Sequence, residues 1–450
     1  MRLLVPALTL IALMLATGSA EAATLRAGPM VGAVAHRQVK IWVQADAAAN
    51  IEIEYWDGDK HAFRPITHAI RVGEETDHVA HFTIGTLEPG RSYRYRVKID
   101  GVTQNVPETL SFKTQALWQW RTDAPNWKLA LGSCNYVNDP PYDRPGKPYG
   151  GTPELKQIYA SIASQKPDLM LWGGDYLYFR EVDQESETGM RYRWQFDRGI
   201  PEVQTLLRTG SHAAIWDDHE YGPNDANSSY VLKGEALKLF KRYWANASYG
   251  LPELPGTFGN FTYNDVEFFL LDGRYHRDSD KLKSDDKAYL GAAQLRWLKN
   301  ALLASVSPIK IIVIGSQITN DASRSEGWHH FPRERAEFMQ FLLDQKINGV
   351  VLLSGDRHFT ELLKTERAGA YPLYELTCSP LLAGPGGSAH ERANPRIVPG
   401  TFVAERNFCT IEFGGAKDNR KLTVQSFSTT GEKKWQQEIG VGEISFAVAK

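Results

Sequence analysis

The chain has 450 residues, of which 42% are hydrophobic, 23% charged and 11% aromatic, and its formal net charge is -2. Because a single hydrophobic core seldom serves so long a chain, this length favours two domains. The near-neutral charge offers no surplus of Lys and Arg, which argues against a nucleic-acid partner.

Residues 1–22 have the composition of a signal peptide. One Arg precedes an apolar run, and the small-residue pattern Ala20-Glu21-Ala22 follows it. We expect cleavage near Ala23 and a periplasmic or secreted mature protein, with a retained N-terminal anchor as the alternative. The apolar run is short for a membrane span and no later segment is long enough, so we predict no transmembrane anchor after cleavage.

Apolar and polar residues alternate with a period of two across residues 25–115, in runs such as VKIWVQA, HVAHFTI and RSYRYRVKID. Turn residues separate these runs, which predicts an N-terminal all-β sandwich domain. The segment LEPGRSYRYRV, residues 87–97, resembles the turn-and-strand signature of fibronectin type III domains. That resemblance implies a fibronectin III/Ig-like sandwich, and a Trp-rich connector follows it.

Patterns of buried strands alternate with helical patterns over residues 126–445. DLMLWGGD, AAIWDDHE and GVVLLSGDRH are typical of buried strands, whereas PELKQIYASIASQ and RERAEFMQFLLDQK are typical of helices. This alternation predicts an α/β domain. Its chemistry is expected in the loops where strands end.

Several of these strands end in residues that bind metals. They are Cys134 in LGSCNY, Asp175 and Tyr178 in GGDYLY, Asp217, Asp218 and His219 in WDDHE, and Asp356 and His358 in SGDRH. Carboxylates crowded at a buried strand end repel one another and lose solvation, so water or a cation must compensate. A single Asp at a strand end is commonly a cap or a turn residue. Carboxylate, phenolate, thiolate and imidazole groups on converging loops, however, form a ligand set for hard and borderline cations.

The order Gly-Ser-Cys, Gly-Asp-x-x-Tyr, Trp-Asp-Asp-His-Glu and Ser-Gly-Asp-x-His, behind a β-rich N-terminal domain, resembles the PhoD-like alkaline phosphatases of the calcineurin-like metallophosphatase superfamily. The resemblance extends from AGPMVGAV to SGDRHFTEL. It implies that residues 126–445 form a metallophosphatase domain, with a β-sandwich core flanked by helices. It also implies an exported alkaline phosphatase that releases phosphate from small-molecule or lipid esters by attack of a metal-bound hydroxide.

The resemblance implies Fe3+ and Ca2+ as the metals. In purple-acid-type relatives the Gly-Asp-x-x-Tyr motif supplies a bridging carboxylate and a phenolate, so Asp175 would bridge the metals and Tyr178 would bind iron. Cys134 would bind iron where other superfamily members carry Asp, and a small buried hydrophobic residue is the alternative reading of this position. His358 would face the iron.

The second metal would be held by Asp218 and Asp356, with Asp217 as an alternative ligand or as a residue that orients the loop. Asp356 replaces the first His of the usual Gly-His-x-His motif, and this oxygen-rich set favours Ca2+ over Zn2+. His219 would lie near the substrate and either protonate the leaving group or donate a hydrogen bond to the phosphoryl oxygens. Arg274 would contact phosphate oxygens, with a surface ion pair as the alternative.

Other residues can each be interpreted in two ways. Asn224, Asp225 and Glu361 would complete a calcium shell or serve as turn and capping residues. Gln317 stands where the superfamily would carry a His ligand, so it would be a ligand or would support one. The two histidines of GWHHF line the substrate entrance or are simply exposed.

The chain has three cysteines, Cys134, Cys378 and Cys409. An odd number in an exported protein leaves at least one thiol outside any intramolecular disulfide. Pairing of Cys378 with Cys409 is the simplest arrangement, and three buried free thiols are the alternative.

Two alternative functions compete with the phosphatase. One is a phosphodiesterase or phospholipase-D-like activity at the same site, because metal chemistry barely distinguishes monoesters from diesters. The other is a calcium-stabilised secreted binding protein with structural metals.

Overall fold

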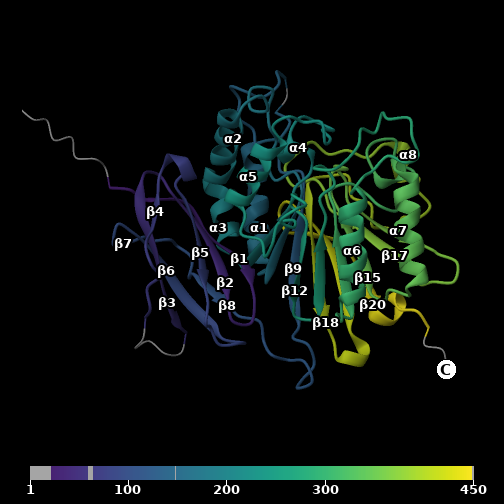
Figure 1. Cartoon of the computed structure of the whole chain (residues 1–450), viewed down its shortest axis with the longest axis horizontal. Coiled ribbons are helices and arrows are strands. Elements are labelled where there is room, and N and C mark those ends of the chain that lie inside the picture. Colours follow the sequence, from purple (N-terminus) through teal and green to yellow (C-terminus); the bar gives the residue numbers. More distant parts are fainter. Residues whose placement is uncertain (1–21, 59–63, 147, 448–450) are drawn as a thin grey trace, which may run out of the picture.

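The structure is a computed structural model that describes residues 22–58, 64–146 and 148–447. A β-rich N-terminal part lies beside a larger part in which helices flank two sheets (Figure 1). The expected signal peptide, residues 1–22, falls almost wholly outside the described residues. In the described part of the chain, no helix combines the length and apolar character that crossing a membrane requires.

The N-terminal part is an all-β sandwich, as the alternating pattern predicts. Its strands are β1 (Leu25–Val34), β2 (Val39–Ala45), β3 (Ala49–Asp57), β4 (Ile70–Val72), β5 (Val79–Ile84), β6 (Ser92–Ile99), β7 (Val102–Thr103) and β8 (Ser111–Lys113). One sheet has the order β4-β3-β6-β7 with β8 paired to β6, and β1, β2 and β5 form the facing layer. Alternate side chains such as Ile41, Ile53 and Val97 are buried between the layers.

One sheet extends from this sandwich into the rest of the molecule. Its order is β20-β19-β18-β9-β10-β11-β1-β2-β5. The additional strands are β9 (Trp127–Gly132), β10 (Leu169–Gly173), β11 (Ser211–Ile215), β18 (Asn407–Gly414), β19 (Lys421–Ser428) and β20 (Lys433–Gly440). The junction is a parallel pairing of β1 with β11, in which Val31 lies opposite Ser211. The sequence did not predict this junction, because an alternating pattern identifies a strand but not its neighbour.

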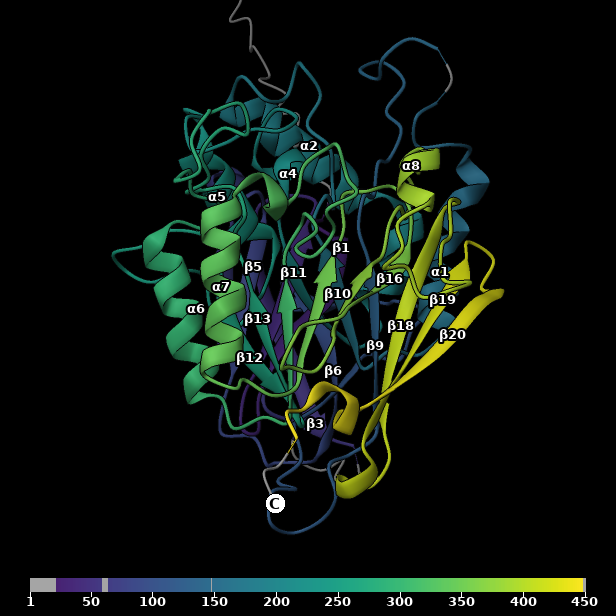
Figure 2. The ribbon, with the colours of Figure 1, turned by 90° about the vertical axis from the view of Figure 1, so that its right-hand side faces the viewer.

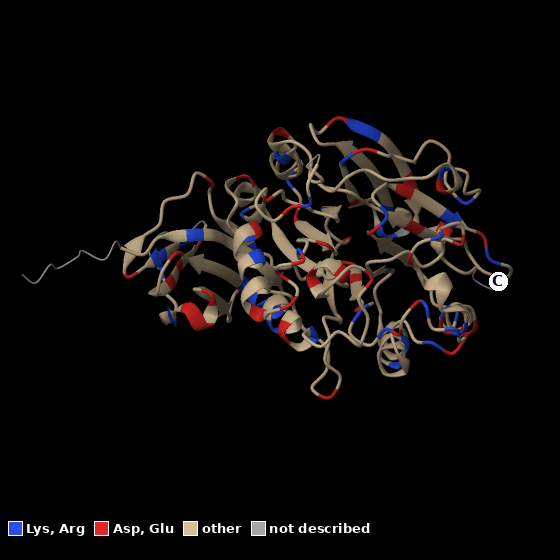
Figure 3. Cartoon of the chain, turned by 90° about the horizontal axis from the view of Figure 1, so that it is seen from above, with Lys and Arg blue, Asp and Glu red and all other residues tan. Residues whose placement is uncertain are grey.

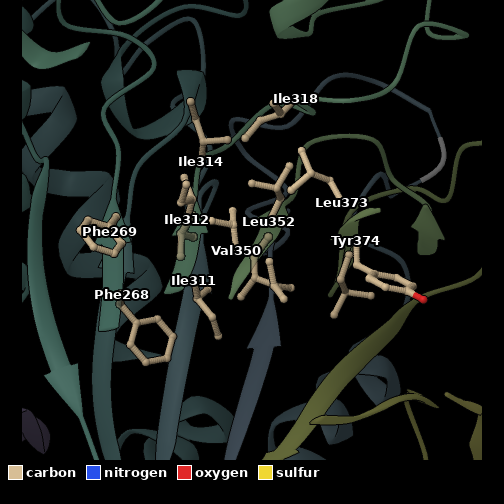
Figure 4. Close-up of a cluster of buried hydrophobic side chains, with 14 of the residues drawn as sticks. Phe268, Phe269, Ile311, Ile312, Ile314, Ile318, Val350, Leu352, Leu373 and Tyr374 are labelled. Carbon is tan, nitrogen blue, oxygen red and sulfur yellow. The ribbon is translucent and has the colours of Figure 1, made fainter. Parts of the chain in front are cut away.

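A second sheet faces the β9–β11 region. It has the order β12-β13-β14-β15-β17-β16, with β12 (Gly259–Tyr263), β13 (Val266–Leu270), β14 (Ile309–Val313), β15 (Val350–Ser354), β16 (Glu361–Thr365) and β17 (Leu373–Thr377). Leu129 and Leu171 of the first sheet share one buried cluster with Phe268 and Ile311 of the second. Figure 4 shows Phe268, Ile311, Val350 and Tyr374 of that cluster. The core therefore lies between two sheets.

Helices cover the outer faces of both sheets. α6 (Ala292–Ala304) and α7 (Pro332–Asp344) lie on the second sheet (Figure 2). α1 (Ile158–Ser164), α2 (Glu187–Gly199), α3 (Gln204–Leu207) and α5 (Lys233–Tyr243) pack on the first, where they bury Met170 and Trp172. Short helices are α4 (Asp218–Tyr221), α8 (Ala389–Arg392) and the 3-10 helices Glu74–Thr76, Pro153–Gln157, Pro201–Val203, Trp328–His330, Lys417–Asn419 and Val441–Ile444. Because the central strands are covered on both faces, they are continuous apolar runs.

The cysteines are arranged as the simplest pairing predicts. Cys378, directly after β17, forms a disulfide with Cys409 in β18, and this bond joins the two facing sheets. Cys134 is free and buried. The alternative of three free thiols is therefore wrong.

Candidate metal centre

The predicted ligands lie on loops at one edge of the two sheets. β9, β10 and β11 are parallel, so their carboxyl ends meet at this edge, and the loop after β15 of the facing sheet reaches the same place. Figure 2 shows α4 and its neighbouring loops above β10 and β11, and Figure 3 looks down on this edge, with Asp and Glu segments close together near its middle. The fold thus brings together side chains that are up to 224 residues apart, from Cys134 to His358.

Four different donor groups surround one point in this edge. Asp175 Oδ2 lies 3.6 Å from Cys134 Sγ and 3.3 Å from the Tyr178 hydroxyl, which is itself 3.3 Å from His358 Nε2. Cys134, Asp175 and Tyr178 are buried. A thiolate, a phenolate, a carboxylate and an imidazole at these separations are suited to one transition-metal ion.

Asp175 also belongs to a second group of donors. Its carboxylate lies within 4.8 Å of ligand atoms of Asp218 and His219, and likewise of Asp217 and Asp356. Asp217 Oδ2 and Asp218 Oδ1 are buried and have no hydrogen-bond partner within the described chain. Buried carboxylate oxygens left in this way are costly, and a cation would satisfy them. The residues therefore fit a metal pair that shares Asp175.

The backbone at the ligands is strained. Cys134, Asp175, Asp356 and His358 have φ angles of 57°, 53°, 62° and 58°, in the left-handed region that side-chain-bearing residues rarely occupy. Each such residue costs on the order of 1 kcal/mol or more and persists only where its surroundings hold it. Nine other described residues with side chains share this region, so the strain agrees with a functional site but does not identify one.

Hydrogen bonds fix the ligand loops relative to one another. The buried Glu220 carboxylate accepts from the backbone N–H groups of Asp175 at 2.8 Å and Asp217 at 3.1 Å, which ties the β10 loop to the β11 loop. Burial raises the pKa of Glu220 to about 8, although those backbone donors favour its charged form. The role of Glu220 was not predicted from the sequence. The pattern that could have indicated it is the capping-box spacing of Asp217-x-x-Glu220 at the start of α4.

The orientation of His358 is fixed by its ring nitrogens. Nδ1 lies 2.7 Å from the carbonyl oxygen of Gly384, which only accepts, so Nδ1 carries the proton. Nε2 is then left with a lone pair toward Tyr178. This is the usual arrangement of a metal-binding histidine, whose other nitrogen donates to a backbone carbonyl.

The buried side chain of Arg274 contacts acidic residues of the site. Its side chain is completely buried, with Nε 2.5 Å from Asp217 Oδ1, Nη1 2.9 Å from Glu326 Oε1 and Nη2 3.5 Å from Asp218 Oδ1. The alternative of an ion pair with nearby carboxylates is therefore confirmed, but its expected place at the surface is wrong. The predicted contact with phosphate stays a prediction, and Arg274 does not line the cavity described below. Glu326, its partner in the loop before α7, was missed because that loop has no periodic pattern.

Burial and like charges raise the pKa of most acidic groups in the site. The pKa of Asp175 and of Cys134 is raised well above the ordinary value, first because each is buried and then because carboxylates surround it. Asp218 is the exception: burial opposes its charge, but His219 and Arg274 outweigh burial and lower its pKa to about 2. Additional positive charge would stabilise the ionised forms of the remaining ligands.

A polar cavity of about 620 Å3 opens beside the ligands. Its wall includes His219, Asn224, Asp225, Lys281, Arg324, Glu326, His330, Asp356, Arg357 and His358. The backbone N–H of Asp225 donates to Asp218 Oδ2 at 2.9 Å, so this turn supports a ligand. One histidine of GWHHF, His330, therefore lies in the cavity wall.

Gln317 and Glu361 contact each other rather than the ligand cluster. The Gln317 side-chain amide donates to Glu361 Oε1 and to Thr377 Oγ1, both at 2.7 Å. Both residues are completely buried. A supporting role under the site suits this placement better than direct ligation.

Comparisons with known proteins agree with this geometry. The profile of the PhoD-like phosphatases matches residues 152–407, and a profile described as Domain of unknown function (DUF7800) matches residues 22–117. Alkaline phosphatase D of Bacillus subtilis (strain 168) is 25% identical over 331 residues, which are 62% of this chain. The match covers 53% of that relative, about half of its length.

Two solved structures share the fold. A structure of PhoD superimposes with a TM-score of 0.72 at 18% identity and covers 91% of both chains. A purple acid phosphatase from yellow lupin (Lupinus luteus) seeds superimposes with a TM-score of 0.63 at 12% identity, over 92% of this chain and 74% of the other. The fold is therefore the metallophosphatase fold with an N-terminal all-β part, as the sequence resemblance implied. Since its profile matches more than half of the residues, the chain belongs to the PhoD-like phosphatase family.

Proposed function

We propose that the chain is an exported metal-dependent hydrolase of phosphate esters. The observation that carries this proposal is the position of Asp175, whose carboxylate lies beside the Cys134 thiol and the Tyr178 hydroxyl and also within 4.8 Å of ligand atoms in the group of carboxylates. Such a shared carboxylate is what a two-metal site requires. The names of the similar proteins, alkaline phosphatase D and purple acid phosphatase, support phosphate esters as substrates.

We assign the two ion positions from the chemistry of the donors. Cys134, Tyr178 and His358 would hold Fe3+, since thiolate and phenolate donate charge to it, and Asp218 and Asp356 would hold Ca2+, with Asp217 as the alternative ligand. Ions bound there would lower the pKa of a coordinated water and neutralise charge on phosphoryl oxygens.

His219 is placed to exchange a proton with the leaving group. Its ring stacks on Tyr178 with 3.8 Å between centroids and lines the polar cavity, and its Nε2 lies 3.9 Å from Asp218 Oδ2. Burial lowers the pKa of His219, whereas the carboxylates of Asp218 and Asp356 favour its protonated form. The protonated ring can donate to the oxygen that leaves phosphorus.

We propose different electrostatic roles for two arginines, Arg274 and Arg357. Arg274 holds Asp217 and Asp218 and balances part of their charge from inside. Arg357 lines the cavity beside Asp356, and its buried Nε has no hydrogen-bond partner within the described residues. Of these two arginines only Arg357 lines the cavity, and a guanidinium there is suited to phosphate oxygens, so we place the phosphate contact on Arg357 and the structural charge on Arg274.

Metal analysis combined with turnover tests this proposal. Protein purified without added metal should contain iron, show a visible charge-transfer band and hydrolyse 4-nitrophenyl phosphate or its bis-ester. Asp175→Asn should lower kcat on the order of a thousandfold or more, because residues that act as one unit have effects of this size. The exposed Asp285→Asn is the matched control and should retain wild-type turnover.

Three results would revise the proposal. Metal-bound protein that hydrolyses neither ester would instead support a secreted binding protein with structural metals. Faster cleavage of the bis-ester would support the phosphodiesterase alternative. Mature protein that begins before Ala23 in N-terminal sequencing would contradict the predicted cleavage.

A further inference from the structure

We propose that a second cavity beside the metal centre binds an aromatic ring of the substrate, so that esters carrying such a ring are preferred. This inference rests on the proposed function and adds the class of substituent that the site recognises.

The second cavity has a volume of about 520 Å3, and aromatic residues make up much of its wall. They are Tyr136, Tyr142, Tyr149, Tyr178 and Phe179, and the charged residues of the wall are Arg144, Arg180 and Glu181. Tyr149, His219 and Asn224 also line the polar cavity, so the two cavities meet beside the ligands. A phosphate held at the metal centre would therefore lie where the aromatic cavity adjoins the polar one.

The aromatic wall is held in place before any ligand binds. Tyr136 contacts Tyr149 edge to face with 4.9 Å between ring centroids, and Tyr178 at 5.1 Å. The Arg180 guanidinium lies 3.8 Å from the Tyr136 ring centroid, and its Nη2 donates to Asp143 Oδ1 at 2.8 Å. Arg180 is itself buried. A preformed wall of this kind lowers the entropic cost of binding a ring.

Part of this aromatic surface is left uncovered by the residues that the structure describes. Tyr142 and Tyr149 are 42% and 44% exposed, whereas Tyr136 is 8% exposed. The edge of Tyr142 packs on Tyr192 with 5.5 Å between centroids, which fixes its ring at the cavity wall. Exposed aromatic rings lining a cavity next to a reaction centre offer stacked and edge-to-face contacts to another ring.

The polar cavity is a poor alternative site for a ring. Its wall contains charged side chains, among them Asp280, Lys281, Arg324, Arg357 and Glu391. An apolar ring there would remove water from these charges without replacing their hydrogen bonds. The ring is therefore directed to the aromatic cavity, and polar substituents or solvent occupy the other.

The test compares benzyl phosphate with ethyl phosphate, because both release an alkoxide and differ in the ring. In the metal-loaded enzyme, Tyr142→Ala should lower kcat/KM for benzyl phosphate about fivefold, the size expected for one lost aromatic contact. The same variant should leave ethyl phosphate essentially unchanged. Tyr142→Phe is the matched control and should resemble wild type with both esters, because it keeps the ring.

A second measurement needs no variant. Phenylphosphonate should inhibit the wild-type enzyme more strongly than methylphosphonate does, and Tyr142→Ala should weaken only phenylphosphonate. Equal losses with both esters, no loss with benzyl phosphate, or equal inhibition by the two phosphonates would overturn the inference. Wild type that hydrolyses 4-nitrophenyl phosphate or its bis-ester but not benzyl phosphate would overturn the ring site alone. Wild type that hydrolyses none of these esters would overturn the proposed function itself, and the ring site with it.

Discussion

Two buried arginines in this molecule are each surrounded by three acidic side chains, but only one of them lies in a metal centre. Arg274 contacts Asp217, Asp218 and Glu326. Arg193, in α2, contacts Asp139 at 3.2 Å, Asp183 at 2.9 Å and Asp197 at 3.7 Å. Both arginines are completely buried.

The difference between the clusters lies in what else converges on the acids. Around Arg274, oxygens of Asp217 and Asp218 lie within 4.8 Å of ligand atoms of Asp175 or Asp356 from other strand ends. Around Arg193, the acids are not among the groups of possible ligands found in the described part of the chain. Buried acids around an arginine are thus not sufficient for a metal site, and convergence of several strand ends is what distinguishes one.

Substitution of either arginine should lower stability the most, and the response to calcium should then distinguish the two clusters. Arg274→Met leaves Asp217 and Asp218 without their arginine, while Glu326 keeps its ion pair with Arg277. Arg193→Met leaves Asp139, Asp183 and Asp197 without theirs. Each substitution should therefore lower the free energy of unfolding of metal-free protein by about 3–5 kcal/mol. Added Ca2+ should restore stability in Arg274→Met alone, because only that cluster has converging ligands. Thermal unfolding with and without Ca2+ measures this. Rescue of both variants, or of neither, would contradict the comparison.

Crowding of the Asp217 carboxylate should lower stability by a smaller amount. A Cβ on Gly315, in the loop after β14, would lie 2.2 Å from Asp217 Cγ, so Gly315→Ala must displace that carboxylate. We expect a loss of about 1–3 kcal/mol in stability, typical of overpacking, together with weaker calcium binding. Gly234→Ala is the matched control, since a Cβ there meets nothing within 4 Å. Calorimetry measures the stability of both variants, and calcium titration in the calorimeter measures their calcium affinity. Unchanged calcium affinity in Gly315→Ala would exclude Asp217 from the site.

The Arg193 cluster should have its own dependence on pH. Burial raises the pKa of Asp197 to about 7, despite the opposing effect of Arg193. Because the folded protein holds this proton more tightly than the unfolded chain does, the contribution to stability is full below about pH 4 and is lost as pH rises toward 7. In Asp197→Asn this dependence should disappear. Denaturant unfolding of both proteins across this range checks it, and parallel curves would contradict the raised pKa.

The sequence predicted which candidate ligands converge better than it predicted the residues that hold them in place. Cys134, Asp175 and Asp217 each follow a hydrophobic run, and the ends of parallel strands meet at one edge of a sheet, so their convergence follows from local pattern. Asp356 follows a similar run in the facing sheet, and its approach to the other three depends on how the two sheets pack. Arg274 and Glu326 come together across 52 residues, and no local pattern encodes that contact.

The fold was predictable to a similar extent. The alternating and continuous apolar runs identified the strands, and the family resemblance supplied the facing sheets. The pairing of Val31 with Ser211, which makes the N-terminal sandwich continuous with the central sheet, was not predictable because it depends on which strand edge is left open. The division into domains at residues 115 and 126 therefore stays a prediction.

Substitution of Cys134 should give the smallest change in stability and the clearest change in the visible spectrum. In the structure Cys134 Sγ accepts from Ser379 Oγ at 3.0 Å, so a serine hydroxyl at this position keeps a hydrogen-bond partner, and Cys134→Ser should change stability by about 1 kcal/mol or less. Iron content should fall and the visible band should shift, because an alcohol is a far weaker ligand for Fe3+ than a thiolate, while bound calcium should stay constant. Tyr178→Phe should weaken the same band without touching the Ca2+ ligands. If Cys134→Ser instead keeps its iron and its spectrum, Cys134 is a small buried hydrophobic residue after all, and iron binding rests on Asp175, Tyr178 and His358 alone.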